Sequence, residues 1–445
     1  MSVSRLGSVA TFALLLPGFT IAHAQSAATP ETLTVAQCVA VARRQASAVR
    51  AAGLDASAAV SDRAAARMNR RPAYFVSAGA WVAPDGAYDP AVTNLGEYHA
   101  QLGMELPLAD GGARSRARLR ADVAARGAEA RRVLATRDAG ERAATLALEV
   151  SRLDEVGLLM REHEAGLADI GALVRSAVRS GARSPADSLR LALAEEDAAL
   201  DREAHDERSR TARLELLEAL ARPLEGTIAV RPEPSRAPET PAGADSLALL
   251  ASAERRPELA VARADEATAG LAAEDAMRSG APAGDLSLDA GLAGTDLTHA
   301  VPASLLADQP NAGFGDRLRR DLGASAALNL RLPVFDAARN ATRRARRLDH
   351  DAAVVRREAE EAAGKRDALA LLERGRSAAK RVGIAENVVT RAESHFLRTK
   401  SLYAAGATTM LDLLDASDLY HSARVRRAET REEYRMIRFE IEDRR

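Results

Sequence analysis

Few residues of this chain stand in patterns that could do chemistry. The sequence contains no Gly-x-Ser-x-Gly elbow, no glycine-rich phosphate loop and no His-Glu-x-x-His zinc motif. Its eight histidines are dispersed singly, and no methionine or histidine cluster marks a copper or silver route. We therefore expect no catalytic residue, no cofactor and no metal site, and we predict that the protein is not an enzyme.

The notable polar residues lie near two glycine turns. Asp412 and Asp415 are three positions apart, so their side chains are neighbours on one face of the expected helix. Asp187 and Asp412 each stand six positions after a turn glycine. An aspartate soon after a helix start is also a common capping or dipole-stabilising group, and this interpretation stays open for Asp187 and Asp415. Tyr403 precedes the second turn by three positions, and interhelical packing would also explain it.

The two glycine turns end two long runs without proline. Read as one helix, residues 334–405 would extend roughly 108 Å, far more than one globular core can cover. Pro107 maps to Pro333 with an offset of 226, and Gly181 maps to Gly406 with an offset of 225. The matched lengths predict an internal two-fold repeat.

The repeat sets the expected domain organisation. We predict a first repeat at 25–223, a linker at 224–243 and a second repeat at 244–445. Each repeat should contain a helix, a β-hairpin, a long helix and a return helix. The expected hairpins are 73–106 and 283–332; the expected helices include 34–69, 108–180, 186–220, 244–278 and 409–442.

Within each expected hairpin the hydrophobic period changes from helical to two. The runs at 74–82 and 97–106 have the length of tilted strands that cross a bilayer, and 285–292 and 322–332 are their counterparts. Tyr74 and Trp81 are candidate membrane-interface aromatics, although a half-buried strand would also accept them. Four strands cannot close a pore, and open edges have no water to bond in lipid. Strands from several chains would have to complete the sheet.

The first long helix carries a heptad seam in its distal half. The spacings alternate between 3 and 4, which is typical of knobs-into-holes packing. The seam comprises Leu153, Val156, Met160, His163, Leu167, Ile170, Val174 and Ala177.

Residues 1–24 are typical of a secretory signal peptide, with Arg5, an apolar run and the cleavage pattern Ala22-His23-Ala24. A buried N-terminal helix is the alternative. The single cysteine, Cys38, excludes an internal disulfide framework and is expected in the core of the first helix. Removing Arg5 from the 62 basic residues leaves 61 against 63 acidic ones, a charge of −2, which does not indicate nucleic-acid binding.

Taken together, these features resemble the TolC-like outer membrane efflux proteins over essentially all of the mature chain. The resemblance rests on an ordered set that occurs twice: a proline-bounded hairpin, Leu-Pro-x-x-Asp, a long rod, a glycine turn with aspartate six positions on, and a return helix. Leu106 to Asp110 and Leu332 to Asp336 are the two Leu-Pro-x-x-Asp elements.

The resemblance implies a mainly α fold with a small β part. Long antiparallel helical hairpins would pack as coiled coils into an α-barrel, and four strands would join a trimeric transmembrane β-barrel. The implied protein is a homotrimeric outer membrane channel of a tripartite efflux or type I secretion system, with a large periplasmic part. Its implied partners are a periplasmic adaptor, an inner-membrane pump of RND, ABC or MFS type, and outer membrane lipid.

The same resemblance assigns roles to residues. Tyr403 and Asp187 match positions that bond to each other and hold the periplasmic entrance closed. Asp412 and Asp415 would form rings of carboxylates that attract cations. The adaptor would contact the hairpin tips: Gly181, Ala182, Arg183, Gly406, Ala407 and Thr408. The strand–helix junctions would be Pro107, Asp110, Pro333 and Asp336.

Thr408 departs from the family pattern. It stands where the best-known member has an arginine, so that closing contact is absent. Arg183 or Lys400 could hold the entrance instead, or the resting aperture could be wider.

Two other classes of protein remain possible from the sequence. A periplasmic adaptor also has a signal and a helical hairpin, but it would show one hairpin flanked by lipoyl-like β segments. A coiled-coil scaffold without a pore would explain the heptads but not the paired alternating runs. The cargo stays open, since drugs, metal ions and polypeptides all leave through channels of this plan.

Overall fold

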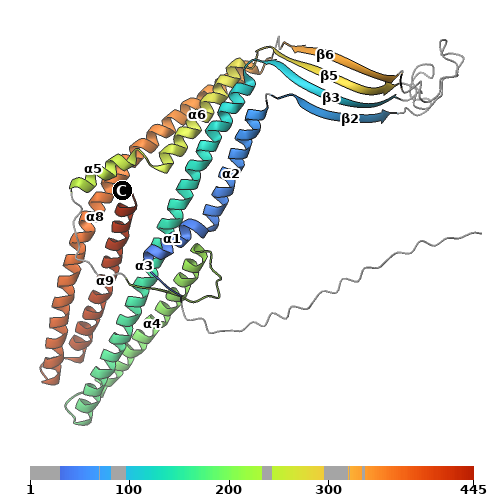
Figure 1. Cartoon of the computed structure of the whole chain (residues 1–445). Coiled ribbons are helices and arrows are strands. Elements are labelled where there is room, and N and C mark those ends of the chain that lie inside the picture. The colour runs from blue at the N-terminus through green and yellow to red at the C-terminus, as the bar shows by residue number, and fades with distance from the viewer. Residues whose placement is uncertain are drawn as a thin grey trace, which may run out of the picture.

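The computed structural model describes residues 31–69, 71–81, 97–232, 243–294, 319, 321–332 and 336–444. They form a long helical rod with a four-stranded sheet at one end (Figure 1). The helices are α1 (Val35–Gln45), α2 (Ser47–Met68), α3 (Ala113–Arg179), α4 (Pro185–Ala219), α5 (Gly243–Ala253), α6 (Pro257–Arg278), α8 (Arg339–Ala404) and α9 (Met410–Asp443). The strands are β1 (Glu31–Leu33), β2 (Ala73–Trp81), β3 (Glu97–Asp110), β4 (Ile228–Val230), β5 (Ala283–Gly294) and β6 (Leu322–Arg331). The prediction of a mainly α fold with a small β part is confirmed.

Some predictions fall on residues outside this description. They are the signal peptide at 1–24, Pro333, half of the linker at 224–243 and the side chain of Trp81.

Helices α3 and α8 are the two rods, and α4 and α9 return beside them (Figure 1). The prediction that the first rod begins at 108 was wrong. β3 continues to Asp110, and Gly111 and Gly112 then turn the chain with φ angles of 58° and 85°, so α3 starts at Ala113. Glycine is suited to these positive φ values because it lacks a Cβ.

The helices expected at 34–69 and 244–278 are each broken in two. Ala46 separates α1 from α2 with φ −53° and ψ 138°, and Arg256 precedes α6 with nearly the same angles, −58° and 140°. The residue before a proline avoids the helical region, which explains the break before Pro257. Nothing in the sequence marks the break at Ala46.

The heptad seam of α3 is confirmed as a buried stripe. Leu153, Val156, Leu167, Ile170 and Val174 are buried, whereas the other seam residues are only partly covered. Near the far end of the rod the seam packs against α4 and α9, in a cluster with Leu191, Met410 and Leu413.

A second core lies at the middle of the rod, where sequence reasoning expected only a linker. β4 lies within 224–243 and pairs in parallel with β1, from Glu31 opposite Ile228 to Leu33 opposite Val230. A three-residue strand is too short to show a hydrophobic period, so the sequence did not reveal it. The predicted burial of Cys38 is confirmed, since it is fully covered in this core.

The four-stranded sheet has the order β2-β3-β5-β6, with every neighbouring pair antiparallel. The strands contain 9, 14, 12 and 10 residues, so β3 is longer than expected. β3 does not end before Pro107 because the register shifts between Pro107 and Ala109. A bulge tolerates a residue that has no N–H to donate.

The two faces of this sheet differ in polarity. Directly paired residues share a face, and side chains alternate between the faces along each strand. One face carries Tyr74, Val76, Leu102, Met104, Leu286, Leu288, Leu328 and Leu330. The other carries Phe75 with Ser77, Gln101, Glu105, Asp285, Ser287, Asp289, Ser325 and Asn329.

Among the described residues, no helix packs on either face of the sheet (Figure 1). The apolar face is therefore exposed: Val76 is 78% and Leu328 69% accessible. The outer edges of β2 and β6 have no neighbouring strand in the described chain. Among the helices described, none has both the length and the hydropathy to cross a membrane.

The end of α4 gives a stability prediction. Ala221 has φ 52°, the conformation that an α-helix end usually assigns to glycine, and side-chain strain there costs about 1–2 kcal/mol. After subtracting the extra unfolded-state freedom of glycine, Ala221→Gly should raise the free energy of unfolding by about 0.5–1 kcal/mol. Urea denaturation followed by circular dichroism measures this change.

The matched control is Ala219→Gly, two residues earlier within the helix, which should lower stability by about 1 kcal/mol. Equal losses in the two variants would contradict the strain at Ala221.

Candidate functional site

Both hairpin tips turn with the same backbone geometry. The turn after α3 is at Gly181. The N–H of Gly181 donates to the carbonyl of Val178, and the N–H of Ala182 donates to the carbonyl of Ala177. At the end of α8, Gly406 donates to Tyr403 and Ala407 to Leu402 in the same pattern. The φ angles of the two glycines are 75° and 78°. These bonds satisfy the last carbonyls of each rod, so the predicted glycine turns are Schellman motifs.

Arg183 connects one tip to the other. Its Nη2 donates to the carbonyl of Tyr403 at 3.0 Å and to the carbonyl of Thr408 at 2.9 Å. Its guanidinium also lies 4.4 Å from the centre of the Tyr403 ring, a cation–π distance. Arg183 thus binds the second hairpin through three contacts, whereas no hydrogen bond or ion pair joins Lys400 to either tip among the described residues.

The structure brings Tyr403 and Asp187 together. Tyr403 is 2% accessible and lies in the core between the hairpins, and its hydroxyl donates to Asp187 Oδ2 over 3.4 Å, which is long for such a bond. Burial and the Asp187 carboxylate raise the pKa of Tyr403, so the phenol stays protonated and remains a donor. Tyr403 therefore combines packing with a polar contact between hairpins.

Asp412 has a local role that the sequence analysis did not assign. Thr409 is the N-cap of α9, and its side chain and N–H exchange hydrogen bonds with Asp412 in a capping box. Bonds from the Thr409 hydroxyl and N–H and from the Thr408 hydroxyl lower the pKa of Asp412 to about 2. The spacing Thr409-x-x-Asp412 is a capping signal that the sequence contained.

Asp415 is different because its carboxylate has no local partner. It is exposed, and no hydrogen bond or ion pair engages it among the described residues. Of the two aspartates predicted to line an entrance, Asp415 is therefore the one whose charge is not already used within the chain.

At the sheet end, the predicted junction residues begin the rods. The Asp110 carboxylate accepts from the N–H groups of Gly112 at 2.8 Å and Arg114 at 2.9 Å, which caps the start of α3. Asp336 accepts from the N–H of Ala338 at 3.0 Å before α8. Pro107 lies at the bulge of β3, three residues before the junction.

Comparison with known proteins decides what this arrangement is. No family model matches the sequence, and no curated protein sequence matches it. Among solved structures, the CmeC outer membrane channel of Campylobacter jejuni matches with a TM-score of 0.75 at 12% identity, over 92% of this chain and 85% of that chain. The outer membrane protein VceC of Vibrio cholerae matches with a TM-score of 0.73 at 14% identity, over 92% and 94%. The open-state MtrE outer membrane channel of Neisseria gonorrhoeae gives 0.59 at 18%, over 91% and 88%.

The chain has the TolC-like outer membrane channel fold. The resemblance inferred from the sequence is thus confirmed at the level of the fold.

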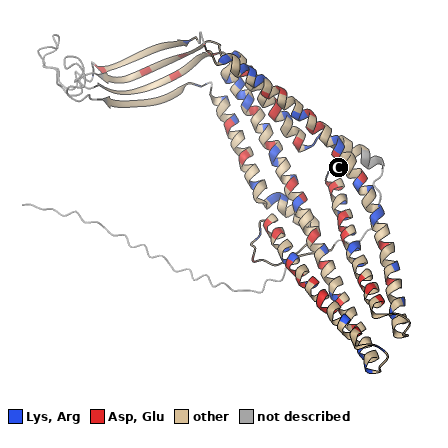
Figure 2. Cartoon of the chain, turned by 180° about the vertical axis from the view of Figure 1, so that it is seen from behind, with Lys and Arg blue, Asp and Glu red and all other residues tan. Residues whose placement is uncertain are grey.

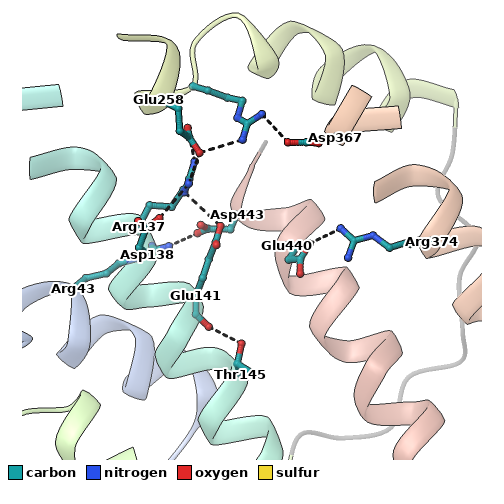
Figure 3. A network of polar contacts seen from close by, with 11 residues as sticks. Arg43, Arg137, Asp138, Glu141, Thr145, Glu258, Asp367, Arg374, Glu440 and Asp443 are labelled. Atoms are coloured by element: carbon teal, nitrogen blue, oxygen red, sulfur yellow. Dashed lines mark hydrogen bonds and ion pairs between the residues drawn. The ribbon is translucent and has the colours of Figure 1, made fainter. Parts of the chain in front are cut away.

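Within this channel fold, a charged network ties five helices together at the middle of the rod (Figure 3). Arg137 of α3 donates to both oxygens of Glu258 of α6, and Arg256 bridges Glu258 to Asp367 of α8. Burial raises the pKa of Glu258, but the hydrogen bonds and charge of Arg137, together with the hydrogen bond from Arg256, outweigh burial and lower the pKa to about 2. Beside it, Arg43 of α1 pairs with Asp443 of α9. No sequence pattern revealed this network because its members are far apart in the chain.

A stacked pair of histidines joins the two hairpins of the channel fold nearer the tips. His163 of α3 and His421 of α9 have ring centroids 4.4 Å apart and planes inclined by 24°. Burial and the charges of His163 and Arg424 lower the pKa of His421 to about 4. Burial also lowers the pKa of His163, against the opposing charge of Asp418, whose Oδ1 lies 3.7 Å from His163 Nε2. Both rings are therefore held neutral at pH 7.

The histidine pair predicts loss of stability in acid. The pKa of His421 is near 6.5 in the unfolded chain and about 4 in the folded chain, so the unfolded state binds protons first as the pH falls. Stability is full above pH 6.5 and declines between pH 6.5 and about 4. His421→Phe should flatten this decline, as measured by the thermal unfolding midpoint in detergent at pH 7.5 and 4.5.

His395→Phe is the control, since His395 is exposed on α8. The His395 variant should lose as much stability in acid as the unmodified protein. If the His421 variant lost equally much, the histidine pair would not be the source of the acid sensitivity.

Proposed function

We propose that this protein is the outer membrane channel of a tripartite efflux or type I secretion system. It is a passive exit duct that receives cargo from a periplasmic adaptor and an inner-membrane pump of RND, ABC or MFS type. It resides in the outer membrane with its helical part in the periplasm. The energy for transport comes from its partners.

The uncovered amphipathic sheet is the observation that carries this proposal. No described element packs against its apolar face. The polar face is formed by the alternate residues of the same strands. A transmembrane β-barrel needs this alternation, with apolar side chains towards lipid and polar ones towards a lumen. Strands of 9 to 14 residues are long enough to cross a bilayer at a tilt.

The open edges of β2 and β6 support a homotrimer. Backbone groups at a sheet edge have no water to bond in lipid, so the edges must pair. Four strands are too few to enclose a pore, whereas β2 of one copy and β6 of the next can close a ring of twelve strands from three copies. The parallel order of elements in residues 25–223 and 244–445 supports the proposed internal repeat.

The hairpin tips are then the periplasmic entrance. The adaptor docks on the turns around Gly181 and Gly406, with Ala182, Arg183, Ala407 and Thr408. Arg183 supplies the closing contact between hairpins that Thr408 cannot make with its short side chain, and the Tyr403–Asp187 contact adds to it. Asp415, with Asp412 beside it, forms a carboxylate ring at the opening.

A periplasmic adaptor or a coiled-coil scaffold is the alternative function. The sheet argues against both, because a water-soluble protein would leave its leucine-rich face exposed to solvent.

Reconstitution into planar bilayers tests the channel. The protein should require detergent, migrate as a heat-modifiable trimer and conduct ions at low unitary conductance. Arg183→Gln, and Tyr403→Phe combined with Asp187→Asn, should raise the conductance severalfold because the contacts between hairpins are lost.

Arg179→Gln removes an equal charge from the same tip without breaking a contact among the described residues, and should leave conductance unchanged. A monomer that stays soluble without detergent would refute the channel. A channel whose conductance ignores Arg183 and Tyr403 would refute only the closing role.

Ion selectivity tests the carboxylate ring. Asp415→Asn should reduce cation preference, measured as the reversal potential in a salt gradient, because three charges leave a narrow opening. Asp412→Asn together with Asp415→Asn should reduce it further.

Thr409→Ala is the matched control for Asp412, since it removes the capping bond but retains the carboxylate. Selectivity that changes with Thr409→Ala and not with Asp415→Asn would show that helix capping, rather than charge, is responsible.

A further inference from the structure

Arginine is concentrated where the two rods leave the sheet. Residues 111–121 contain four arginines and residues 337–348 contain five, with no acidic residue in either segment. Figure 2 shows the ribbon segments coloured for Lys and Arg concentrated at the sheet-proximal end of the helices. We call the exposed or half-exposed members of this group the arginine collar: Arg118, Arg120, Arg344, Arg346 and Arg347.

Helix electrostatics does not explain the collar. The N-terminus of a helix carries partial positive charge and favours acidic side chains. Helices α4, α6 and α9 follow this rule with Asp187, Glu258 and Asp412 in their first turns, whereas α3 and α8 have no acidic residue there. The collar arginines begin at the sixth residue of each helix, beyond the first turn in which the dipole acts, so the helix dipole does not account for them.

Some nearby arginines are explained by contacts within the chain. Arg116 is buried, pairs with Asp275 and donates to the carbonyl of Gly111. Arg343 donates to the carbonyls of Ala276 and Met277 at the end of α6. These side chains fasten the junction and are not part of the collar.

The collar arginines have weaker internal partners or none. Among the described residues, no hydrogen bond or ion pair engages the side chain of Arg118 or Arg344. Arg120 pairs with Asp275 and Arg346 with Asp349, but about half of each arginine side chain stays accessible. The group is therefore a net positive surface with free donors.

The same positions recur on both rods. Arg344 follows Arg118 by 226 positions, and Arg346 follows Arg120 by 226, the offset that also separates the two Leu-Pro-x-x-Asp prolines. Arg118 and Arg344 are each the sixth residue of their helix, roughly 9 Å along the axis from its start. An arginine side chain at this position leans back towards the helix start and can reach the polar headgroup layer, which adds roughly 5–7 Å outside each face of the hydrocarbon core.

We propose that the arginine collar binds the phosphates of anionic phospholipid headgroups in the leaflet below the sheet. This inference rests on the proposed function, because it requires the sheet to lie in a membrane. Guanidinium groups bind phosphate oxygens through paired, charge-assisted hydrogen bonds. The collar thus fixes the height of the channel in the membrane and selects the lipids around it.

Native mass spectrometry of the detergent-solubilised protein tests the proposal. The probe is an equimolar mixture of dioleoyl-phosphatidylglycerol and dioleoyl-phosphatidylcholine. Wild type should retain the anionic lipid preferentially, and 0.5 M salt should weaken this preference. Arg118→Gln with Arg344→Gln should lower the ratio of bound anionic to zwitterionic lipid by about fivefold for each arginine that meets a headgroup.

The matched control is Arg179→Gln with Arg398→Gln, which removes one exposed arginine from each rod at its opposite end. The control should keep the wild-type lipid ratio, and both double variants should remain conducting trimers. A wild type without preference for the anionic lipid, or an equal loss in the control, would overturn the proposal.

Conductance in bilayers distinguishes failure of the lipid proposal from failure of the proposed channel function. If the collar variant keeps its lipid ratio but shifts ion selectivity towards cations, the arginines face the lumen and the lipid proposal is wrong. If the protein neither needs detergent nor conducts, the proposed function itself fails. A conducting trimer without lipid preference refutes only the collar.

Discussion

Backbone hydrogen bonding at the two edges of one small sheet constrains this protein more than any side-chain contact. Strands β2 and β6 end the sheet with unpaired N–H and C=O groups, and no described element covers either face. In water the leucine-rich face would be exposed to solvent, and in lipid the unpaired edges would lack hydrogen-bond partners. In the proposed trimer, pairing with further copies satisfies the edges and the membrane covers the apolar face.

Contacts at successive levels of the rod hold the helices together between the sheet and the tips. Asp110 and Asp336 cap the rods where the strands end. At the middle of the rod, the charged network around Glu258 connects five helices. Between the middle and the tips, the seam of α3 packs against α4 and α9. In this network Glu258 receives hydrogen bonds from two arginines, while the Nε atoms of Arg137 and Arg256 have no hydrogen-bond partner among the described residues. Towards the tips, the hairpins contact each other through the neutral histidine pair, the Tyr403–Asp187 bond, the guanidinium groups of Arg183 and Arg424, and an apolar cluster that includes Leu167 and Met410.

Charge along the molecule is arranged by position. Arginines without internal partners lie beside the sheet, and an aspartate without a partner lies beside the tips. Between these ends, ion pairs join neighbouring helices, such as that of Arg152 on α3 with Glu432 on α9. We proposed that the unpaired arginines bind lipid phosphates and that the unpaired aspartate meets passing ions, and neither of these partners belongs to the chain.

The sequence by itself determined the long rods, the four strands, the glycine turns and the heptad seam, because each follows from local periodicity or from the backbone freedom of glycine. It also indicated that Tyr403 and Asp187 would meet, through the resemblance and not through spacing. Tertiary structure alone decided the break at Ala46, the pairing of β1 with β4, the Glu258 network and the contact of Arg183 with Thr408. These depend on residues up to 400 positions apart, such as Arg43 and Asp443, which come together only when the helices pack. A one-dimensional pattern specifies which face of an element is apolar, but the partner that covers that face is set by packing in three dimensions.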